Sequence, residues 1–151
     1  MINNKNRKAF LDMIAWSEGT STIPESENGY NVLVGGELFF SYNDHPRQLV
    51  VINSKLKSTA AGRYQLLSRY YDYYKKLLKL PDFSAPSQDA IAIQQIKECK
   101  ALDDVDAGNF ERAVKKCSKI WASFPGNNYG QHQQKISALQ EIYTEAGGIL
   151  A

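Results

Sequence analysis

The segment 10–19 places a carboxyl group in surroundings that suit proton transfer. Four of its residues recur at the spacing of one helix face: Phe10, Met13, Ile14 and Ser17. Glu18 follows Ile14 by four residues and therefore lies on the same face, and Gly19 predicts the end of the helix. Burial and the negative end of the helix dipole both raise the pKa of a carboxyl, which favours a general acid. The alternative is a surface glutamate at a frayed helix end.

Other groups with chemical potential form weaker patterns. The sequence Asp44-His45-Pro46 lacks an accompanying Ser or Cys nucleophile motif, and Gly35-Gly36 lacks the spacing of a phosphate-binding loop. Two histidines and two cysteines show no metal-ligand spacing, so we expect neither a metal nor a cofactor. Cys99 and Cys117 fall on apolar helix faces and are expected to be buried free thiols, with a contact between two helices as the alternative.

Composition favours one domain. The chain has 151 residues, of which 43% are hydrophobic, and a net charge of +2. This fits a single globular domain over residues 1–151, and the small charge gives no argument for nucleic acid. No apolar run approaches the ~20 residues of a membrane span. The N-terminus lacks the apolar core of a signal peptide, so accumulation in the cytoplasm is expected.

The β-like part of the chain is short. Residues 20–29 are predicted as a loop, and residues 30–34 and 37–40 as two strands joined by a Gly35-Gly36 turn. Residues 48–52 are ambiguous. Glu18 then lies at the junction of a helical part and a hairpin lobe, and a cleft is expected between the two lobes.

From Ser58 onward the pattern is helical. A helix is predicted from Ser58 or Thr59 to Pro81, a second over 87–100, a break at 103–106, and a third stripe over 110–124. A polar loop at 127–131 precedes a last helix that ends near Gly147. In the first of these helices, small residues precede Tyr64 and Gln65, which offer a flat ring and an amide to a ligand; ordinary helix packing is the alternative. Of the tyrosines at 70–74, half are expected to face the core, with Tyr71 and Tyr74 on the buried face; a sugar-stacking platform is the alternative.

Several blocks, in this order along nearly the whole chain, resemble the lambda-type endolysins of bacteriophages. They are residues 9–13, 15–19, 35–39, 44–47, 61–69, 87–90, 120–123, 125–126 and 129–131. The resemblance implies an α+β, lysozyme-like fold, mainly helical, and a peptidoglycan lytic transglycosylase that leaves 1,6-anhydro-MurNAc ends. The catalytic acid of that family matches Glu18, which acts as acid and then as base.

The resemblance also implies the other site residues. Gln65 matches a glutamine on the floor of the cleft, and Tyr129 a residue that contacts sugar; Ser58, Tyr64 and Ser123 are weaker candidates. Asn31 stands where the resembled sequence has Asp, so it can hold a substrate hydroxyl but cannot act as a base. Two mobile lips are expected at residues 48–57 and 125–138.

The expected partners are peptidoglycan glycan strands. A phage holin would release the protein from the host cytoplasm to the periplasm, and the protein is expected to be a monomer. Two other functions stay open at this point. One is a water-using muramidase with Glu37 or Asp44 as a second carboxylate, and the other is a catalytically silent wall-binding domain.

Overall fold

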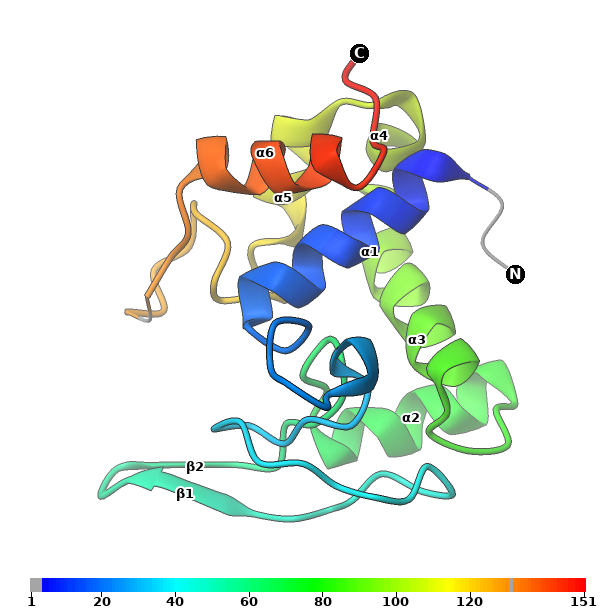
Figure 1. Ribbon diagram of the computed structural model, residues 1–151. Coiled ribbons are helices and arrows are strands. Elements are labelled where there is room, and N and C mark those ends of the chain that lie inside the picture. Colours follow the sequence, from blue (N-terminus) through cyan, green and yellow to red (C-terminus); the bar gives the residue numbers. More distant parts are fainter. Residues whose placement is uncertain (1–3, 131) are drawn as a thin grey trace. The chain divides into compact units, whose positions relative to one another are not determined.

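The computed structural model describes residues 4–130 and 132–151, which divide into two compact units. One unit comprises the described residues up to Glu18 together with those from Ala92 onward, and the other is Gly19–Ile91. Within these ranges no helix has the length and apolar character of a membrane span. The elements are α1 (Lys5–Glu18), the 3-10 helix η1 (Glu27–Gly29), β1 (Val50–Asn53), β2 (Leu56–Ser58), α2 (Ser68–Leu78), α3 (Ala85–Glu98), α4 (Leu102–Ala107), α5 (Phe110–Cys117) and α6 (Ile136–Glu145) (Figure 1).

Helix α1 forms the centre of the first unit. It packs against α6 and α4, and α4 packs against α5 (Figure 1). Phe10 on α1 meets Phe110 and Phe124 edge-on, with ring centroids 6.1 and 6.3 Å apart. Phe110 in turn lies 4.7 Å from the ring of Tyr143 on α6. The apolar face predicted for the first helix therefore holds this core together.

The stripe predicted over residues 110–124 is only partly helical. Helix α5 stops at Cys117, and Trp121 and Phe124 reach the core from successive turns, where they are 2% and 0% exposed. Ser118 explains the stop, because its hydroxyl donates to the carbonyl of Lys115 at 2.7 Å. Such a side-chain bond offers the backbone an alternative to the helical pattern.

The break predicted at residues 103–106 is wrong, because α4 occupies it. Two aspartates lie in its first turn, where the helix dipole favours negative charge. Asp104 is 6% exposed and accepts from Lys116 Nζ at 2.6 Å and from Arg112 at 3.4 Å. Gly108, with φ of 80°, ends the helix.

The C-terminal residues are fastened to the first unit by three hydrogen bonds. The amide of Ile149 donates to Asn6 Oδ1 at 2.9 Å, and the amide of Ala151 donates to the carbonyl of Gly108 at 3.0 Å. The Tyr143 hydroxyl donates to the carbonyl of Ile149 at 3.2 Å. These bonds join the tail to the first turn of α1, to the residue that ends α4 and to α6.

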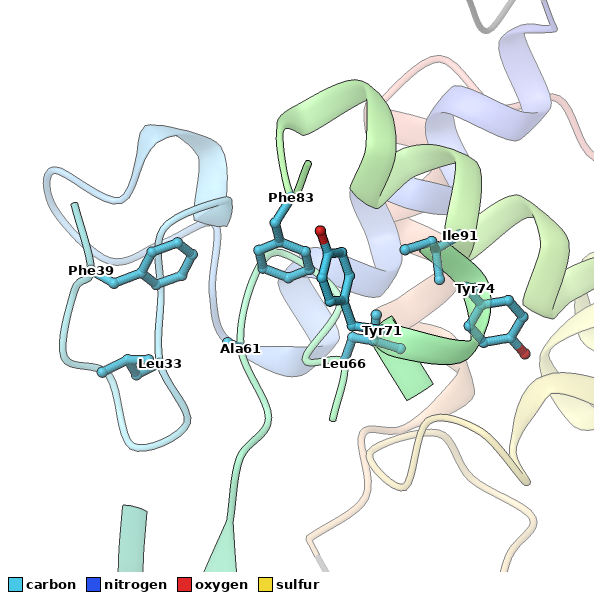
Figure 2. Close-up of a cluster of buried hydrophobic side chains, with 8 residues drawn as sticks. All are labelled: Leu33, Phe39, Ala61, Leu66, Tyr71, Tyr74, Phe83 and Ile91. Carbon is cyan, nitrogen blue, oxygen red and sulfur yellow. The ribbon is translucent and has the colours of Figure 1, made fainter. Parts of the chain in front are cut away.

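The second unit has its own core. Tyr71 stands edge-on to Phe83, with centroids 5.1 Å apart and planes at 81°, and Phe39 lies 6.1 Å from Phe83 (Figure 2). The cluster consists of Leu33, Phe39, Ala61, Leu66, Tyr71, Tyr74, Phe83 and Ile91 (Figure 2). Tyr71 and Tyr74 confirm the buried face predicted for the tyrosine-rich helix, α2.

The predicted hairpin at residues 30–40 is confirmed as a turn but not as a pair of strands. Gly35 and Gly36 both have positive φ, and Leu33 N donates to the carbonyl of Glu37 at 2.7 Å. Beyond this turn the segment makes isolated bridges, because Val32 also accepts from Gly62 N and Leu33 also pairs with Ala61. The hairpin with two strands is β1–β2, whose register shifts between Val51 and Asn53, and β1 includes residues 50–52 of the segment that the sequence left ambiguous.

A helix is predicted to begin at Ser58 or Thr59. In the structure this helix, α2, begins nine or ten residues later, at Ser68. Gly62 and Gln65 have φ of 84° and 55°, and an α-helix cannot include such left-handed residues. Thr59 nevertheless serves α2, because its hydroxyl oxygen accepts from the amide of Ser68 at 3.0 Å. Residues 59–67 thus form a folded turn.

Candidate active site

Glu18 is the last residue of α1, and Gly19 follows with φ of 76°, as the sequence predicts. The Glu18 side chain is partly exposed. Its burial raises the pKa of the carboxyl above the ordinary value, and a hydrogen bond from Ser123 opposes part of this shift. A carboxyl group with a raised pKa keeps its proton closer to neutral pH, which is the property a general acid requires.

Two serines form a chain that ends on this carboxyl group. Ser123 Oγ donates to Glu18 Oε2 at 2.6 Å, and Ser17 Oγ lies 2.6 Å from Ser123 Oγ. The resemblance implies a sugar contact for Ser123, whereas the structure places its hydroxyl on Glu18. The two residues are 105 positions apart in the sequence, so no local pattern reveals this pairing.

Ser123 is held in place by its neighbours along the chain. Trp121 and Phe124 are buried on either side of it, and the carbonyl of Ser123 accepts from Gln134 N at 2.8 Å. Asn127 Nδ2 donates to the carbonyl of Phe124 at 2.9 Å and contacts those of Ser118 and Ala122. The turn that carries Ser123 is therefore fixed by the core and by the following loop.

Tyr129 lies on that loop, and the residue is 54% exposed. Its amide donates to Asn127 Oδ1 at 3.2 Å, and its hydroxyl donates to the carbonyl of Lys119 at 3.0 Å. The backbone and the hydroxyl of Tyr129 are thus both held, while the residue stays exposed. Such a ring can serve as a platform for the apolar face of a sugar.

In the second unit, Gln65 lies in the folded turn before α2. Its Nε2 donates to the carbonyls of Gly62 and Val32 at 2.9 and 3.2 Å, which orients the amide so that Oε1 is the end left for a donor. The left-handed backbone of Gln65 is held by the same turn.

Asn31 contributes a buried acceptor to the same unit. The residue is 5% exposed, and Nδ2 donates to the carbonyl of Glu25 at 3.3 Å. Among the described residues, Asn31 Oδ1 is buried without a hydrogen-bond partner. A buried acceptor without a donor is costly in folding, so such an atom is a candidate for binding a hydroxyl or amide of a ligand.

Tyr64 and Ser58 have partners within the fold. The Tyr64 hydroxyl donates to Asp89 at 2.6 Å and accepts from Arg63 at 3.0 Å, and the side chain is 5% exposed. The hydroxyl oxygen of Ser58 accepts from Ala60 N at 3.1 Å. These bonds favour a role for both residues in shaping the 58–67 segment, and their expected contact with sugar stays a prediction.

The candidates for a second carboxylate differ in their surroundings. Both oxygens of Asp44 accept from Arg47, which lowers the pKa of that carboxyl below its ordinary value. The neighbouring His45 is buried, accepts from Arg47 N at Nδ1 and holds the carbonyl of Leu66 with Nε2. Its burial and these two bonds explain His45 as a structural residue. The other candidate carboxylate, Glu37, is exposed.

Two further expectations concern metals and thiols. Among the described residues, no group of three or more His, Cys, Asp or Glu side chains is arranged to hold a metal ion. Cys99 and Cys117 are buried and free, as predicted. A hydrogen bond with Cys117 lowers the pKa of the Cys99 thiol. The two thiols are therefore in contact, which is the alternative that the sequence left open.

The chain is similar to known proteins along nearly its whole length. A family model described as Endolysin matches residues 8–150. The chain belongs to the endolysin family. It is 58% identical to the endolysin of Escherichia phage lambda over 147 residues, which is 96% of this chain and 93% of the relative. The endolysin of Escherichia phage P2 is 48% identical over 159 residues and covers 98% of this chain and 96% of its own.

Solved structures agree with the family. Bacteriophage lambda lysozyme complexed with a chitohexasaccharide matches with a TM-score of 0.96 and 56% identity, over 100% of both chains. A second structure of lysozyme from bacteriophage lambda gives a TM-score of 0.92 and 55% identity, also over 100% of both. The α+β lysozyme-like fold expected from the sequence is confirmed. This endolysin is accordingly a peptidoglycan-cleaving enzyme.

Proposed function

We propose that this endolysin is a lytic transglycosylase that cleaves MurNAc-β-1,4-GlcNAc bonds with Glu18 as its single acid and base. The observation that carries the proposal is the Glu18 carboxyl at the end of α1, whose pKa is raised by burial and whose Oε2 is held by Ser123. One carboxyl in this state can give a proton and take one back in the same reaction cycle.

The reaction needs no second carboxylate. Protonated Glu18 gives its proton to the glycosidic oxygen as the bond from that oxygen to C1 of MurNAc breaks. The resulting carboxylate removes the proton of the C6 hydroxyl of the same sugar, and O6 closes on C1. The products are a free hydroxyl on GlcNAc and a 1,6-anhydro-MurNAc end, and Glu18 is again protonated.

The other site residues serve binding in this proposal. Oε1 of Gln65 and Oδ1 of Asn31 accept from sugar hydroxyl or acetamido groups, and the exposed ring of Tyr129 supports a sugar face. The chitohexasaccharide bound to bacteriophage lambda lysozyme supports a glycan as ligand. Neither a metal nor another cofactor takes part.

Hydrolysis is the second candidate, with Glu37 or Asp44 as the partner of Glu18. Asp44 fits this role poorly, because Arg47 holds both of its oxygens. Asn31 cannot act as a base or nucleophile. The transglycosylase mechanism, in which Glu18 acts with the C6 hydroxyl of the substrate, therefore accounts for these residues better than hydrolysis does.

Product analysis tests the proposal. Digestion of peptidoglycan should give muropeptides that are one water lighter than the products of a hydrolase, measured by mass spectrometry. Products of hydrolytic mass would refute the transglycosylase mechanism and favour a muramidase.

The role of Glu18 is tested separately by Glu18→Gln, which keeps the shape of the side chain and removes its acid. We expect cleavage to fall by at least about 100-fold, the lower end of what general acid–base catalysis contributes. Glu141→Gln is the matched control, since Glu141 is an exposed carboxylate of the same unit on α6. Full activity of Glu18→Gln would exclude an enzyme whose catalysis centres on Glu18.

We further propose that one chain acts alone, accumulates in the host cytoplasm and reaches the periplasm after a holin opens the inner membrane. Expression with and without a holin, followed by culture turbidity, tests the release step. Sedimentation of the purified chain tests the monomer.

A further inference from the structure

Ser17 is a buried polar residue that the reaction described above does not use. It is the penultimate residue of α1 and 6% exposed, and its hydroxyl oxygen lies 2.6 Å from that of Ser123. Among the described residues, Ser123 is the one hydrogen-bond partner that the structure gives to the Ser17 hydroxyl. The contact therefore lies directly behind the bond from Ser123 to Glu18.

The direction of this chain follows from counting protons. An ionised carboxylate only accepts, so Ser123 must give its single hydroxyl proton to Glu18 Oε2. Ser123 then has no proton left for Ser17, and Ser17 must be the donor in the contact between them. Both O···O distances are 2.6 Å, at the short end for hydroxyl bonds, as expected when bonds in a chain polarise one another.

The same chain discriminates between the two oxygens of protonated Glu18. With the proton on Oε1, every donor of the chain keeps its acceptor. With the proton on Oε2, Glu18 would donate to Ser123 and the chain would reverse. Ser17 would then need a new acceptor for its own proton, and among the described residues its hydroxyl has Ser123 alone as a partner. The arrangement with the proton on Oε1 is thus the satisfied one.

The pKa shift of Glu18 is not attributed to charged neighbours. The raised pKa of Glu18 has two causes in the structure, burial and the Ser123 bond. Within α1, Lys8 is paired with Asp12, and Arg7 is paired with Asp106 at the far end of the helix. None of the charged residues of α4, α6 and the turn before Ser123 is among these causes: Asp103, Asp104, Asp106, Glu141, Glu145 and Lys119.

We propose that Ser17 is a positioning residue that acts through Ser123, holding the chain in one direction so that Oε1 of Glu18 both delivers the proton and takes it back. The inference rests on the proposed function, because it names the oxygen of the acid that faces substrate. Oε2 remains an acceptor of the Ser123 bond throughout the cycle.

The direct test is a titration of Glu18 that does not depend on activity. Glutamate labelled with carbon-13 at the side-chain carboxyl is followed by NMR against pH in the free protein, and Glu18→Gln assigns the signal. In Ser123→Ala the carboxylate loses a donor, so the acid dissociation constant of Glu18 should fall about tenfold. In Ser17→Ala the Ser123 hydroxyl becomes a weaker donor to Glu18, so the acid dissociation constant of Glu18 should also fall, by about threefold.

A double variant and two further variants test whether Ser17 acts through its hydrogen bond to Ser123 or through the packing of its side chain. Since Ser17 acts through Ser123, the variant S17A/S123A should titrate like Ser123→Ala alone. Ser17→Thr keeps the hydroxyl and should titrate like the unchanged protein. Ser118→Ala is the matched control, because Ser118 is equally buried in the same unit but donates to the carbonyl of Lys115. Alanine favours helix, so Ser17→Ala is expected to fold.

Kinetics on soluble glycan strands complete the test. We expect kcat to fall about threefold in Ser17→Ala and about tenfold in Ser123→Ala with KM unchanged, both smaller than the roughly 100-fold or more that the acid itself contributes. An unchanged Glu18 titration in Ser17→Ala, or one shifted to lower pH, would overturn the proposed direction of the chain. This result leaves the proposed function intact, whereas activity of Glu18→Gln contradicts that function and leaves the titration result standing.

Discussion

Gly62 is the position where a single methyl group should disturb the second unit most. Its φ is 84°, and an added Cβ would lie 2.4 Å from Gln88 Oε1 and 2.9 Å from Phe83 Cζ. The left-handed backbone alone disfavours an L-residue by about 1–2 kcal/mol. Overpacking in a filled core adds about 1–3 kcal/mol. We therefore expect Gly62→Ala to lower the free energy of unfolding by about 2–5 kcal/mol.

Gly147→Ala is the matched control for this prediction. Gly147 has φ of 99°, and nothing lies within 4 Å of the position its Cβ would take, so only the backbone contribution applies. Urea denaturation followed by circular dichroism gives both values under one protocol. An equal loss in the two variants would refute the claim that Gln88 and Phe83 close the space at Gly62, because backbone strain alone would then account for both.

Three further results are expected. Asp104→Asn should destabilise the protein by about 1–3 kcal/mol at pH 7, because Lys116 holds the pKa of this buried carboxyl below its ordinary value. That stability is present above the unfolded pKa of about 4 and is lost as pH falls through the folded pKa, so urea unfolding at pH 3 should show a smaller difference. Cleavage should be unaffected by EDTA, measured as turbidity loss of cell walls, and a strong inhibition would contradict a metal-free site. Cleavage should also persist above the pH at which an ordinary glutamate ionises, since burial raises the pKa of Glu18; an alkaline limit near pH 4 in a pH–rate profile would contradict this.

The position of Glu18 could be predicted because all of its signals are local. The apolar spacing before it and Gly19 after it lie within ten residues, and the helix forms as that pattern indicates. The bond to Ser123 could not be predicted, since it depends on how the turn after α5 folds. Ser17 gave a partial signal as a polar residue on an otherwise apolar face.

The segment 58–67 shows why the rest was missed. Small residues before Tyr64 look like the start of a helix, but Gln88 and Phe83 fill the space beside Gly62 and hold a left-handed turn there. The turn at Gly35-Gly36 was recognisable from local chemistry. The strands beside it were not formed, because residues 32–34 also pair with residues 60–62. Long-range partners thus overrode local preference in both places.

The attachment of the tail to α1 has a consequence for how the chain frays. Ile149 N is held by Asn6 Oδ1, and Ala151 N by the carbonyl of Gly108, so release of the tail also frees a side chain of the first helical turn. Backbone amides at the two extremities should therefore exchange with solvent deuterium as one cooperative group. Asn6→Ala should accelerate exchange at Ile149 although 143 residues separate the two positions in sequence.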